Sequence, residues 1–308
     1  MKRTAAVLLC LVLLLAITVP AFGDAGKTPP YPDSKFFSCG EYELHYRVKE
    51  PAGEKKGQIL LLHGFLASTC CWEPLSAILA ENGYECVLVD LPDFGFSSRE
   101  TAGSERVPRE DLIYALMTAL SDEPWYVAGH SMGGYTALAL AQKYPDSVKN
   151  VLLYSAAGNN GVFDLIRPLT TNDTVARLVG RLIERIGANR TLVRFIMSYA
   201  TRDRAYLAGY DYDALMAPYR IEGTGAGIVY SLSTHTRTDY EAVRHMAPIL
   251  DVTGTRDIVC PPTERLSLLR SLPDGSERVV LKGAGHMLIE SRAAETAAVT
   301  LDFLAKNP

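Results

Sequence analysis

The chain has 308 residues, of which 48% are hydrophobic and 9% aromatic, and its formal net charge is −4. This length and composition suffice for a packed core in one large domain or two smaller ones, and they exclude a disordered chain. The slight excess of acidic residues gives no overall basic face, so we expect no nucleic-acid partner.

The N-terminus has the pattern of a segment that directs export. Two basic residues precede an uncharged apolar run over residues 5–19, and small residues follow just before position 24. This pattern predicts a secretory signal peptide over residues 1–23 and a secreted or periplasmic protein. The run is shorter than the roughly 20 apolar residues that a membrane-spanning helix needs. An uncleaved N-terminal membrane anchor is therefore the alternative.

Cysteines in an exported protein are candidates for disulfides, and an odd number leaves at least one thiol either free or in an intermolecular pair. Two of the five that follow residue 23 are adjacent and are not expected to bridge each other. We expect all five to be structural, with one disulfide possible between partners that the sequence does not identify. The five are Cys39, Cys70, Cys71, Cys86 and Cys260.

The first half of the chain alternates strand and helix patterns. Residues 24–34 contain three prolines and are expected to form an extended linker. Alternating residues then predict a hairpin of strands at 36–38 and 42–48. Continuous apolar runs at 58–62 and 84–89 predict buried strands, with a helix between them. Buried strands that alternate with helices predict a mostly parallel sheet with helices on both faces.

The alternation is interrupted once. A helix pattern at 109–120, a strand at 125–128, a helix at 135–142 and a strand at 148–154 continue the order. From 158 to 242 only helix patterns are present, for example at 174–186 and 192–199. Strands at 247–252 and 277–281, with helices at 262–272 and 293–304, then complete the chain. The sequence therefore predicts an α/β core of residues 35–157 and 243–308, with a helical insertion over 158–242.

A Gly129-x-Ser131-x-Gly133 turn joins the strand at 125–128 directly to the following helix. On so sharp a turn a side chain at either glycine would collide with the neighbouring strand or helix, and the serine hydroxyl is left exposed at the apex. The helix also directs its unpaired N–H groups and the positive end of its dipole towards the same point. The turn therefore predicts a nucleophile at Ser131.

This turn resembles the nucleophile elbow of the α/β-hydrolase fold family. The run Gly129–Gly134 is similar to the elbows of esterases and monoacylglycerol-type lipases. The resemblance extends in motif order over residues 35–157 and 243–308. It implies that residues 158–242 form a helical cap over the active site and that no cofactor or metal takes part.

A serine hydroxyl needs a base to take its proton, and the base needs a carboxylate to hold its tautomer. Asp257 and His286 each follow a late strand, in the order serine, acid, histidine that the family has. The resemblance implies that they complete a catalytic triad with Ser131, and that the backbone N–H groups of Phe65 and Met132 form the oxyanion hole. The other position for the acid, after the strand at 148–154, has no carboxylate before residue 164.

Two other histidines and two departures from the family pattern complete the site motifs. His63 and His130 lie beside the predicted oxyanion turn and nucleophile, and we expect both to be structural. Asp93 occupies a position where relatives often have glycine. Glu290-Ser291 stands where a Glu-x-Pro often follows the catalytic histidine.

The predicted cap is rich in arginine and tyrosine: residues 158–242 contain ten arginines, seven tyrosines and no lysine. Arg177, Arg181 and Arg185 have the spacing i, i+4, i+8 and share one helix face. A solvated helix face is the plain interpretation of this stripe. Contact with an anionic substrate group or with an anionic membrane surface is the alternative, so peripheral membrane contact through the cap or the N-terminal segment is possible.

The sequence therefore predicts a serine hydrolase that cleaves small to medium carboxylic esters through an acyl-enzyme intermediate. A serine rather than an aspartate at position 131 argues against epoxide hydrolases and haloalkane dehalogenases. Carbon–carbon bond hydrolases and lactonases with the same triad are alternatives, as is a member of the fold that binds a ligand without turnover.

Overall fold

The computed structural model describes residues 31–99, 107–158, 172–232, 238–261 and 265–308. The predicted signal peptide and most of the predicted linker lie outside the described residues. No helix in the described ranges is both long and apolar enough to cross a membrane.

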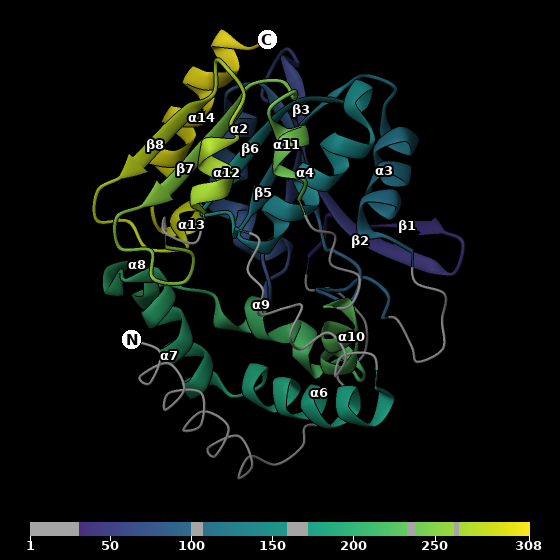
Figure 1. Ribbon diagram of the computed structural model, residues 1–308. Coiled ribbons are helices and arrows are strands. Elements are labelled where there is room, and N and C mark those ends of the chain that lie inside the picture. The colour runs from purple at the N-terminus through teal and green to yellow at the C-terminus, as the bar shows by residue number, and fades with distance from the viewer. Residues whose placement is uncertain (1–30, 100–106, 159–171, 233–237, 262–264) are drawn as a thin grey trace.

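An eight-stranded sheet in the order β1-β2-β4-β3-β5-β6-β7-β8 forms the centre of the molecule (Figure 1). The first two strands form an antiparallel hairpin, and β2 is also antiparallel to β4; all other neighbours are parallel. The mostly parallel sheet predicted from the sequence is confirmed. The strands are β1 (Ser34–Cys39), β2 (Tyr42–Lys49), β3 (Gly57–Leu62), β4 (Tyr84–Val89), β5 (Trp125–His130), β6 (Val148–Tyr154), β7 (Ile249–Gly254) and β8 (Glu277–Leu281).

Helices cover both faces of the sheet, which explains why its central strands are apolar without alternation. Along β3, Ile59 and Leu61 pack in one hydrophobic cluster and Leu60 and Leu62 in another, because successive side chains point to opposite faces. The first cluster includes residues of η1 (Thr69–Trp72), α2 (Glu73–Glu81), α13 (Leu288–Ser291) and α14 (Ala293–Lys306). The second includes residues of α3 (Arg109–Leu120), α4 (Met132–Lys143) and α12 (Leu266–Arg270).

Further helices lie between β6 and β7 in the chain and form a layer at one end of the sheet (Figure 1). Hydrogen bonds join this layer to loops that follow parallel strands. The Tyr219 hydroxyl donates to the carbonyl of Leu66, after β3, and the N–H of His286, after β8, donates to the carbonyl of Ala200. The layer therefore lies over the carboxyl ends of the strands. It contains α6 (Asp173–Gly187), α7 (Arg190–Thr201), α8 (Arg204–Ala208), α9 (Tyr212–Met216), η3 (Ala217–Arg220) and α10 (Thr224–Ser231).

The remaining short elements are η2 (Pro145–Ser147) and α11 (Tyr240–Val243). The helix predicted over 262–272 is shorter in the structure, where α12 spans Leu266–Arg270; residues 262–264 lie outside the described residues. All five cysteines named above are free thiols, so the one disulfide that the sequence left possible is not formed.

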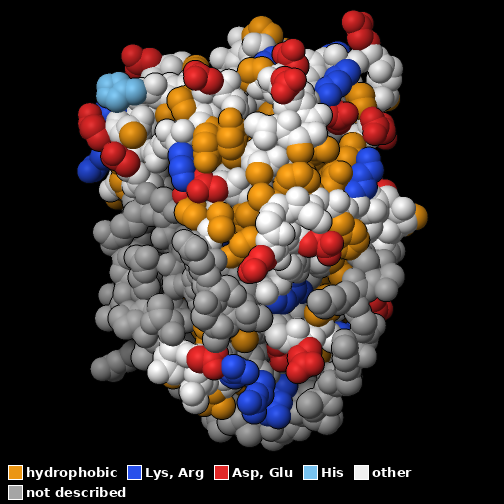
Figure 2. Space-filling model, turned by 90° about the vertical axis from the view of Figure 1, so that its right-hand side faces the viewer, with side chains coloured by type: hydrophobic (Ala, Val, Ile, Leu, Met, Phe, Trp, Pro, Cys, Tyr) orange, Lys and Arg blue, Asp and Glu red, His pale blue; other side chains and the backbone are white. Residues whose placement is uncertain are grey.

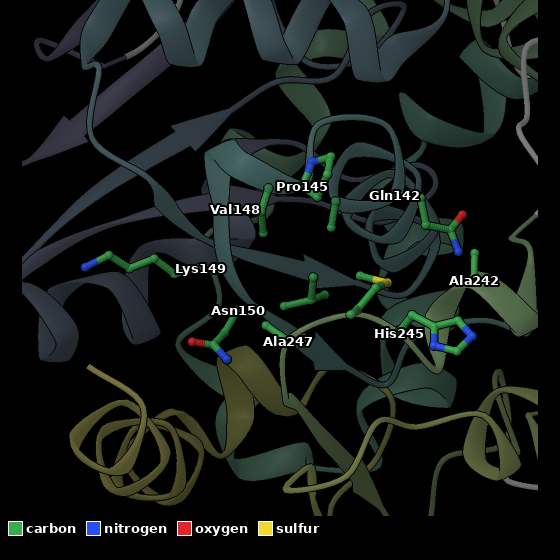
Figure 3. A pocket seen from close by; sticks show the side chains of 11 residues that line it. Gln142, Pro145, Val148, Lys149, Asn150, Ala242, His245 and Ala247 are labelled. Carbon is green, nitrogen blue, oxygen red and sulfur yellow. The ribbon is translucent and has the colours of Figure 1, made fainter.

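A cavity of about 220 Å³ lies at the amino end of β6, far along the strand from the loops that end it (Figure 3). Its wall combines the end of α4, the start of β6 and residues 242–247. Asn150 closes one side by donating from its amide to the carbonyl of Pro248 at 2.8 Å. The cavity is therefore separate from the predicted catalytic residues, which follow the carboxyl ends of strands.

Candidate active site

Ser131 joins β5 to α4 and has an unusual backbone conformation for a residue with a side chain. Its φ is 53° and its ψ −118°, outside the regions that such residues ordinarily occupy. The end of β6 holds this conformation from two sides. The Ser131 N–H donates to the carbonyl of Tyr154 at 3.0 Å, and its own carbonyl accepts from the N–H of Ala157 at 3.1 Å.

The glycines of the elbow are required by close backbone contact. A Cβ atom at Gly133 would lie 2.1 Å from the carbonyl oxygen of Leu62, and one at Gly129 would lie 2.4 Å from that of Gly133. Neither neighbour is a flexible side chain, so neither can move aside. The elbow therefore packs on the backbone at the end of β3, which also begins the turn that carries Phe65.

That turn lies directly against Ser131. A Cβ atom at Gly64 would be 3.0 Å from the Cβ of Ser131. Phe65 follows on the turn, and Met132 is the first residue of α4. The N–H groups of Phe65 and Met132 have no hydrogen-bond partner among the described residues. Two free donors thus flank the serine, the kind of arrangement that an oxyanion hole needs.

Asp257 and His286 lie in adjacent loops, after β7 and β8, and their side chains are hydrogen-bonded. Nδ1 of His286 lies 3.0 Å from Oδ2 and 3.2 Å from Oδ1 of Asp257. The carboxylate is fixed in turn by the N–H groups of Val259 and Cys260, which donate to Oδ1 at 3.0 and 2.9 Å. With its proton on Nδ1, His286 keeps Nε2 free to accept one.

The surroundings of Asp257 favour its charged form. Burial raises its pKa, but the hydrogen bond and the charge of His286, with the N–H of Cys260, outweigh this effect, and the pKa is lowered. The carboxylate is therefore ionised at neutral pH and can hold the imidazole tautomer.

The Ser131 hydroxyl and Nε2 of His286 make no hydrogen bond to each other or to any other described residue. The side chain of Ser131 is almost closed off, with 9% of the residue exposed. Catalytic hydrogen bonds are often longer in an unliganded enzyme and shorten when the substrate binds. The structure brings the acid and the histidine together, and it leaves the serine and the histidine apart.

His130 connects the elbow to the histidine loop. Its Nε2 donates to the carbonyl of His286 at 3.0 Å, and the two rings lie 4.8 Å apart between centroids. Burial lowers the pKa of His130 to about 3, with a further contribution from His286, so the ring is neutral. The N–H of His286 is held by Ala200 at the end of α7 at 2.9 Å. The backbone of His286 is thus held by the elbow on one side and by α7 on the other.

His63 braces the turn that carries Phe65, and its ring nitrogens are not free to serve as a base. Its Nε2 accepts from the N–H of Leu91 at 3.0 Å, and its Nδ1 donates to the carbonyl of Gly64 at 2.8 Å. Burial lowers its pKa, so the ring is neutral. Both ring nitrogens are occupied by the backbone, in line with the structural role expected from the sequence.

A second chain of serine, histidine and aspartate was not predicted. His45 lies 2.7 Å from Asp90 through Nδ1 and 2.9 Å from the Ser34 hydroxyl through Nε2. Asp90 also accepts from the N–H groups of Thr69 and Phe96. Ser34 begins a strand and has no glycine turn or helix N-terminus behind it, so we interpret this chain as structural. Its partners lie far apart in the sequence, and no periodicity indicates them.

The structure shows the surroundings of both positions at which the chain departs from the family pattern. Asp93 has a φ of 73°, in the left-handed region that favours glycine. Glu290 is buried and accepts from the Tyr206 hydroxyl at 3.1 Å, so it ties α13 to α8. Among the described residues no group of three or more histidine, cysteine, aspartate or glutamate side chains is placed to hold a metal ion.

Glu290 should make the stability of the protein depend on pH. Burial raises its pKa from 4.5 to about 8, against the opposing effect of hydrogen bonds from Tyr206 and Tyr210. Between these values the unfolded chain is ionised at this position and the folded chain is not. The folded state binds more protons there, and stability falls as the pH rises, by up to about 1.4 kcal/mol per pH unit.

We expect Glu290→Gln to remove this slope, so that the variant gains stability over the wild type as the pH rises from 5 to 8. Urea unfolding of both proteins across this range measures the difference. Glu295→Gln, at an exposed position on α14, is the control and should leave the slope unchanged. Parallel pH profiles for the wild type and Glu290→Gln would contradict the prediction.

Comparison with known proteins agrees with this architecture. Residues 58–293 match the model of a family described as alpha/beta hydrolase fold. The abhydrolase domain-containing protein abhd-5.2 of Caenorhabditis elegans is 36% identical over 120 residues, which cover 36% of this chain and 26% of that protein. A 2-hydroxy-6-oxononadienedioate/2-hydroxy-6-oxononatrienedioate hydrolase of Escherichia coli is 26% identical over 284 residues, which cover 89% of this chain and 96% of that protein.

The chain thus spans about a quarter of the first relative's length and nearly all of the second's. The crystal structure of the enol-lactonase from Burkholderia xenovorans is similar, with a TM-score of 0.70, 20% sequence identity, and coverage of 88% of this chain and 100% of that one. Because the family model matches most of the chain, from β3 to the start of α14, the protein belongs to the α/β-hydrolase fold family, which supports a hydrolase activity.

Proposed function

We propose that this protein is a serine hydrolase that cleaves carboxylic esters of small to medium size. Ser131 is the nucleophile, His286 the base and Asp257 the group that orients it. The observation that carries the proposal is the 3.0 Å contact between Nδ1 of His286 and the carboxylate of Asp257, which is ionised and held by backbone N–H groups. The loop that carries His286 is also hydrogen-bonded to His130, the residue before the serine.

In the first step Nε2 of His286 takes the hydroxyl proton of Ser131 while Oγ attacks the ester carbonyl carbon. The negative charge that forms on the carbonyl oxygen is stabilised by the N–H groups of Phe65 and Met132, each worth roughly 3 to 4 kcal/mol in such a site. Collapse of this intermediate breaks the ester C–O bond, and His286 returns the proton to the departing alcohol. An acyl group then remains on Ser131.

In the second step Nε2 of His286 takes a proton from water, and the resulting hydroxide attacks the acyl carbon. The same N–H groups stabilise the second intermediate, which releases the carboxylic acid and returns the proton to Ser131. No other group is needed, since Asp257 stays ionised throughout and the neutral His130 keeps the His286 loop in place.

A series of p-nitrophenyl esters with acyl chains of increasing length tests the substrate class. We expect steady-state turnover by the full-length chain over a continuous range of short and medium acyl chains, with a fall in kcat/KM for long ones. Release of nitrophenolate at 405 nm measures the rate. A single stoichiometric burst without turnover would contradict the proposal and indicate a binding member of the fold, and no release from any ester would contradict it too.

A second candidate is hydrolysis of a carbon–carbon bond or of a lactone with the same three residues. It is favoured by the relative from Escherichia coli, whose match covers nearly the whole of both chains. A 2-hydroxy-6-oxo-dienoate and a small lactone should therefore be tested beside the ester series. A kcat/KM on either that exceeds every ester value would select this candidate over the ester hydrolase.

A further inference from the structure

The helix α7 carries apolar side chains on both its inner and its outer face. Leu192, Val193 and Met197 are buried against the rest of the molecule. Phe195, Ile196 and Tyr199, at positions i, i+1 and i+4, point outward with 46%, 38% and 43% of each residue exposed. The inner face is accounted for by the core, whereas the side chains of the outer stripe remain exposed.

A loop beside this helix extends the apolar surface. Ile258 and Val259 directly follow Asp257, and they are 39% and 43% exposed. Helix α7 and this loop line one open hollow of about 620 Å³. Phe195 and Tyr199 on the helix and Ile258 on the loop form its apolar walls.

Three arginines surround the same hollow. They are Arg202 and Arg204, which follow and begin helices at its edge, and Arg256 in the loop. All three are exposed, and none makes an ion pair with a residue in the described ranges. Arg202 lies over the ring of Tyr199 at 4.8 Å from its centroid. Asp203, between the first two arginines, pairs with Arg292 at 3.2 Å instead. Positive charge is therefore gathered at an apolar surface without an acid paired to it in the described chain.

Some other arginines of this layer are paired with acidic residues. Arg177, in the stripe that the sequence singled out on α6, pairs with Asp173 at 2.7 Å, and Arg190, at the start of α7, pairs with Asp213 at 2.9 Å. On the side of the molecule where α3 and α10 lie, acidic side chains are spread among the basic ones (Figure 2). Arg181 on α6 and Arg194 on α7 are also exposed without an ion pair to a described residue, but neither lines the hollow, where three such arginines meet apolar side chains.

We propose that this surface, formed by the outer face of α7, the loop 256–259 and the three arginines, docks on a lipid bilayer that contains anionic phospholipid. Exposed apolar side chains beside arginines are typical of helices that lie in the plane of the membrane interface. The guanidinium fork binds phosphate oxygens in pairs, and each basic residue near an anionic leaflet adds attraction. In this arrangement Phe195, Tyr199 and Ile258 enter the acyl region while the arginines bind headgroup phosphates.

The docking surface goes beyond the proposed esterase activity and does not depend on it. It does lie next to the candidate site, because the Ala200 carbonyl at the end of α7 binds the N–H of His286. The loop that carries Asp257 also carries Ile258 and Val259. A bound membrane would therefore lie against the two segments that hold the acid and the histidine.

Vesicle sedimentation tests the proposal with the full-length chain. We expect stronger binding to vesicles of phosphatidylcholine with about one-third phosphatidylglycerol than to phosphatidylcholine alone, and a loss of this preference when salt is raised above physiological ionic strength. The triple variant Arg202→Gln/Arg204→Gln/Arg256→Gln should bind the anionic vesicles on the order of 100-fold more weakly. Phe195→Ser should weaken binding to them without changing its dependence on salt.

The control is a second triple variant, Arg244→Gln/Arg270→Gln/Arg278→Gln, at exposed positions away from the hollow. It has the same change in net charge and should bind the anionic vesicles like the wild type. Equal binding by both triple variants would overturn the proposal, as would binding that ignores the anionic lipid and so comes from the apolar N-terminal run alone. If inorganic phosphate stabilises the protein against thermal unfolding while vesicles do not bind, the proposal would be overturned in favour of a soluble anion as the ligand. If the wild type forms a dimer that the first triple variant does not form, it would be overturned in favour of a second copy of the chain. Circular dichroism checks that each variant is folded.

Discussion

Ser131→Ala should lower kcat for the best p-nitrophenyl ester by about 10⁵- to 10⁶-fold, because the first step has no other nucleophile at the elbow. The residual rate would come from the free N–H groups of Phe65 and Met132. The substitution removes one oxygen from a side chain that makes no hydrogen bond within the described chain. We therefore expect little change in stability, and thermal unfolding beside the kinetics separates loss of chemistry from loss of fold.

Ser34→Ala is the matched control. Its hydroxyl is hydrogen-bonded to His45, which is bound to Asp90, so it has the partners that the proposed mechanism requires of Ser131. Ser34 lies at the start of β1, however, and not on a nucleophile elbow. We expect its kcat to stay within a factor of two or three of the wild type. An enzyme silenced by Ser34→Ala and active with Ser131→Ala would contradict the assignment of the nucleophile.

Asp257→Asn should lower kcat by on the order of 10⁴-fold, with little effect on the fold. Oδ1 of an asparagine can still accept from the N–H groups of Val259 and Cys260. Its amide would then present N–H to Nδ1 of His286, which must give up its proton to accept that bond. The proton moves to Nε2, and the ring can no longer take the proton of Ser131. Steady-state kinetics on the best ester measure the loss.

Asp90→Asn changes the other aspartate that binds a buried histidine. Asp90 is fully buried, and His45 with its neighbours holds its pKa low despite the opposing effect of burial. We expect this variant to lose stability in thermal unfolding and to keep most of its kcat when folded.

If the kcat of Asp257→Asn stays within tenfold of the wild-type value, Asp257 does not orient the base.

Local pattern was enough to predict the parts of the fold that are contiguous in the chain. The apolar runs of β3, β4, β5 and β6 are buried on both faces, and the strand, turn and helix around Ser131 follow one another without a gap. The nearness of Asp257 and His286 could be predicted because each lies in the loop after a strand, and parallel strands end at the same edge of a sheet.

The missed features join residues that are far apart in the sequence. The bond from His130 to the carbonyl of His286 spans 156 positions, and that from Tyr206 to Glu290 spans 84. No hydrophobic period or turn motif encodes such a pair, since it depends on how two loops meet after the strands have assembled. The three arginines at the hollow were hidden for the same reason, because only the folded structure shows that Asp203, between two of them, pairs with Arg292 instead.

The contact between α7 and the histidine loop has a consequence for building chimaeras of this protein. A Cβ atom at Gly285 would lie 2.3 Å from the carbonyl oxygen of Thr201, so the end of α7 meets the loop backbone to backbone. The helices between β6 and β7 are a single insertion in the chain, yet they are not an exchangeable module. A chimaera that takes this insertion from a relative must also take the relative's residues at positions 285 and 286, which contact the end of α7. Otherwise the inserted helices will displace the imidazole of His286.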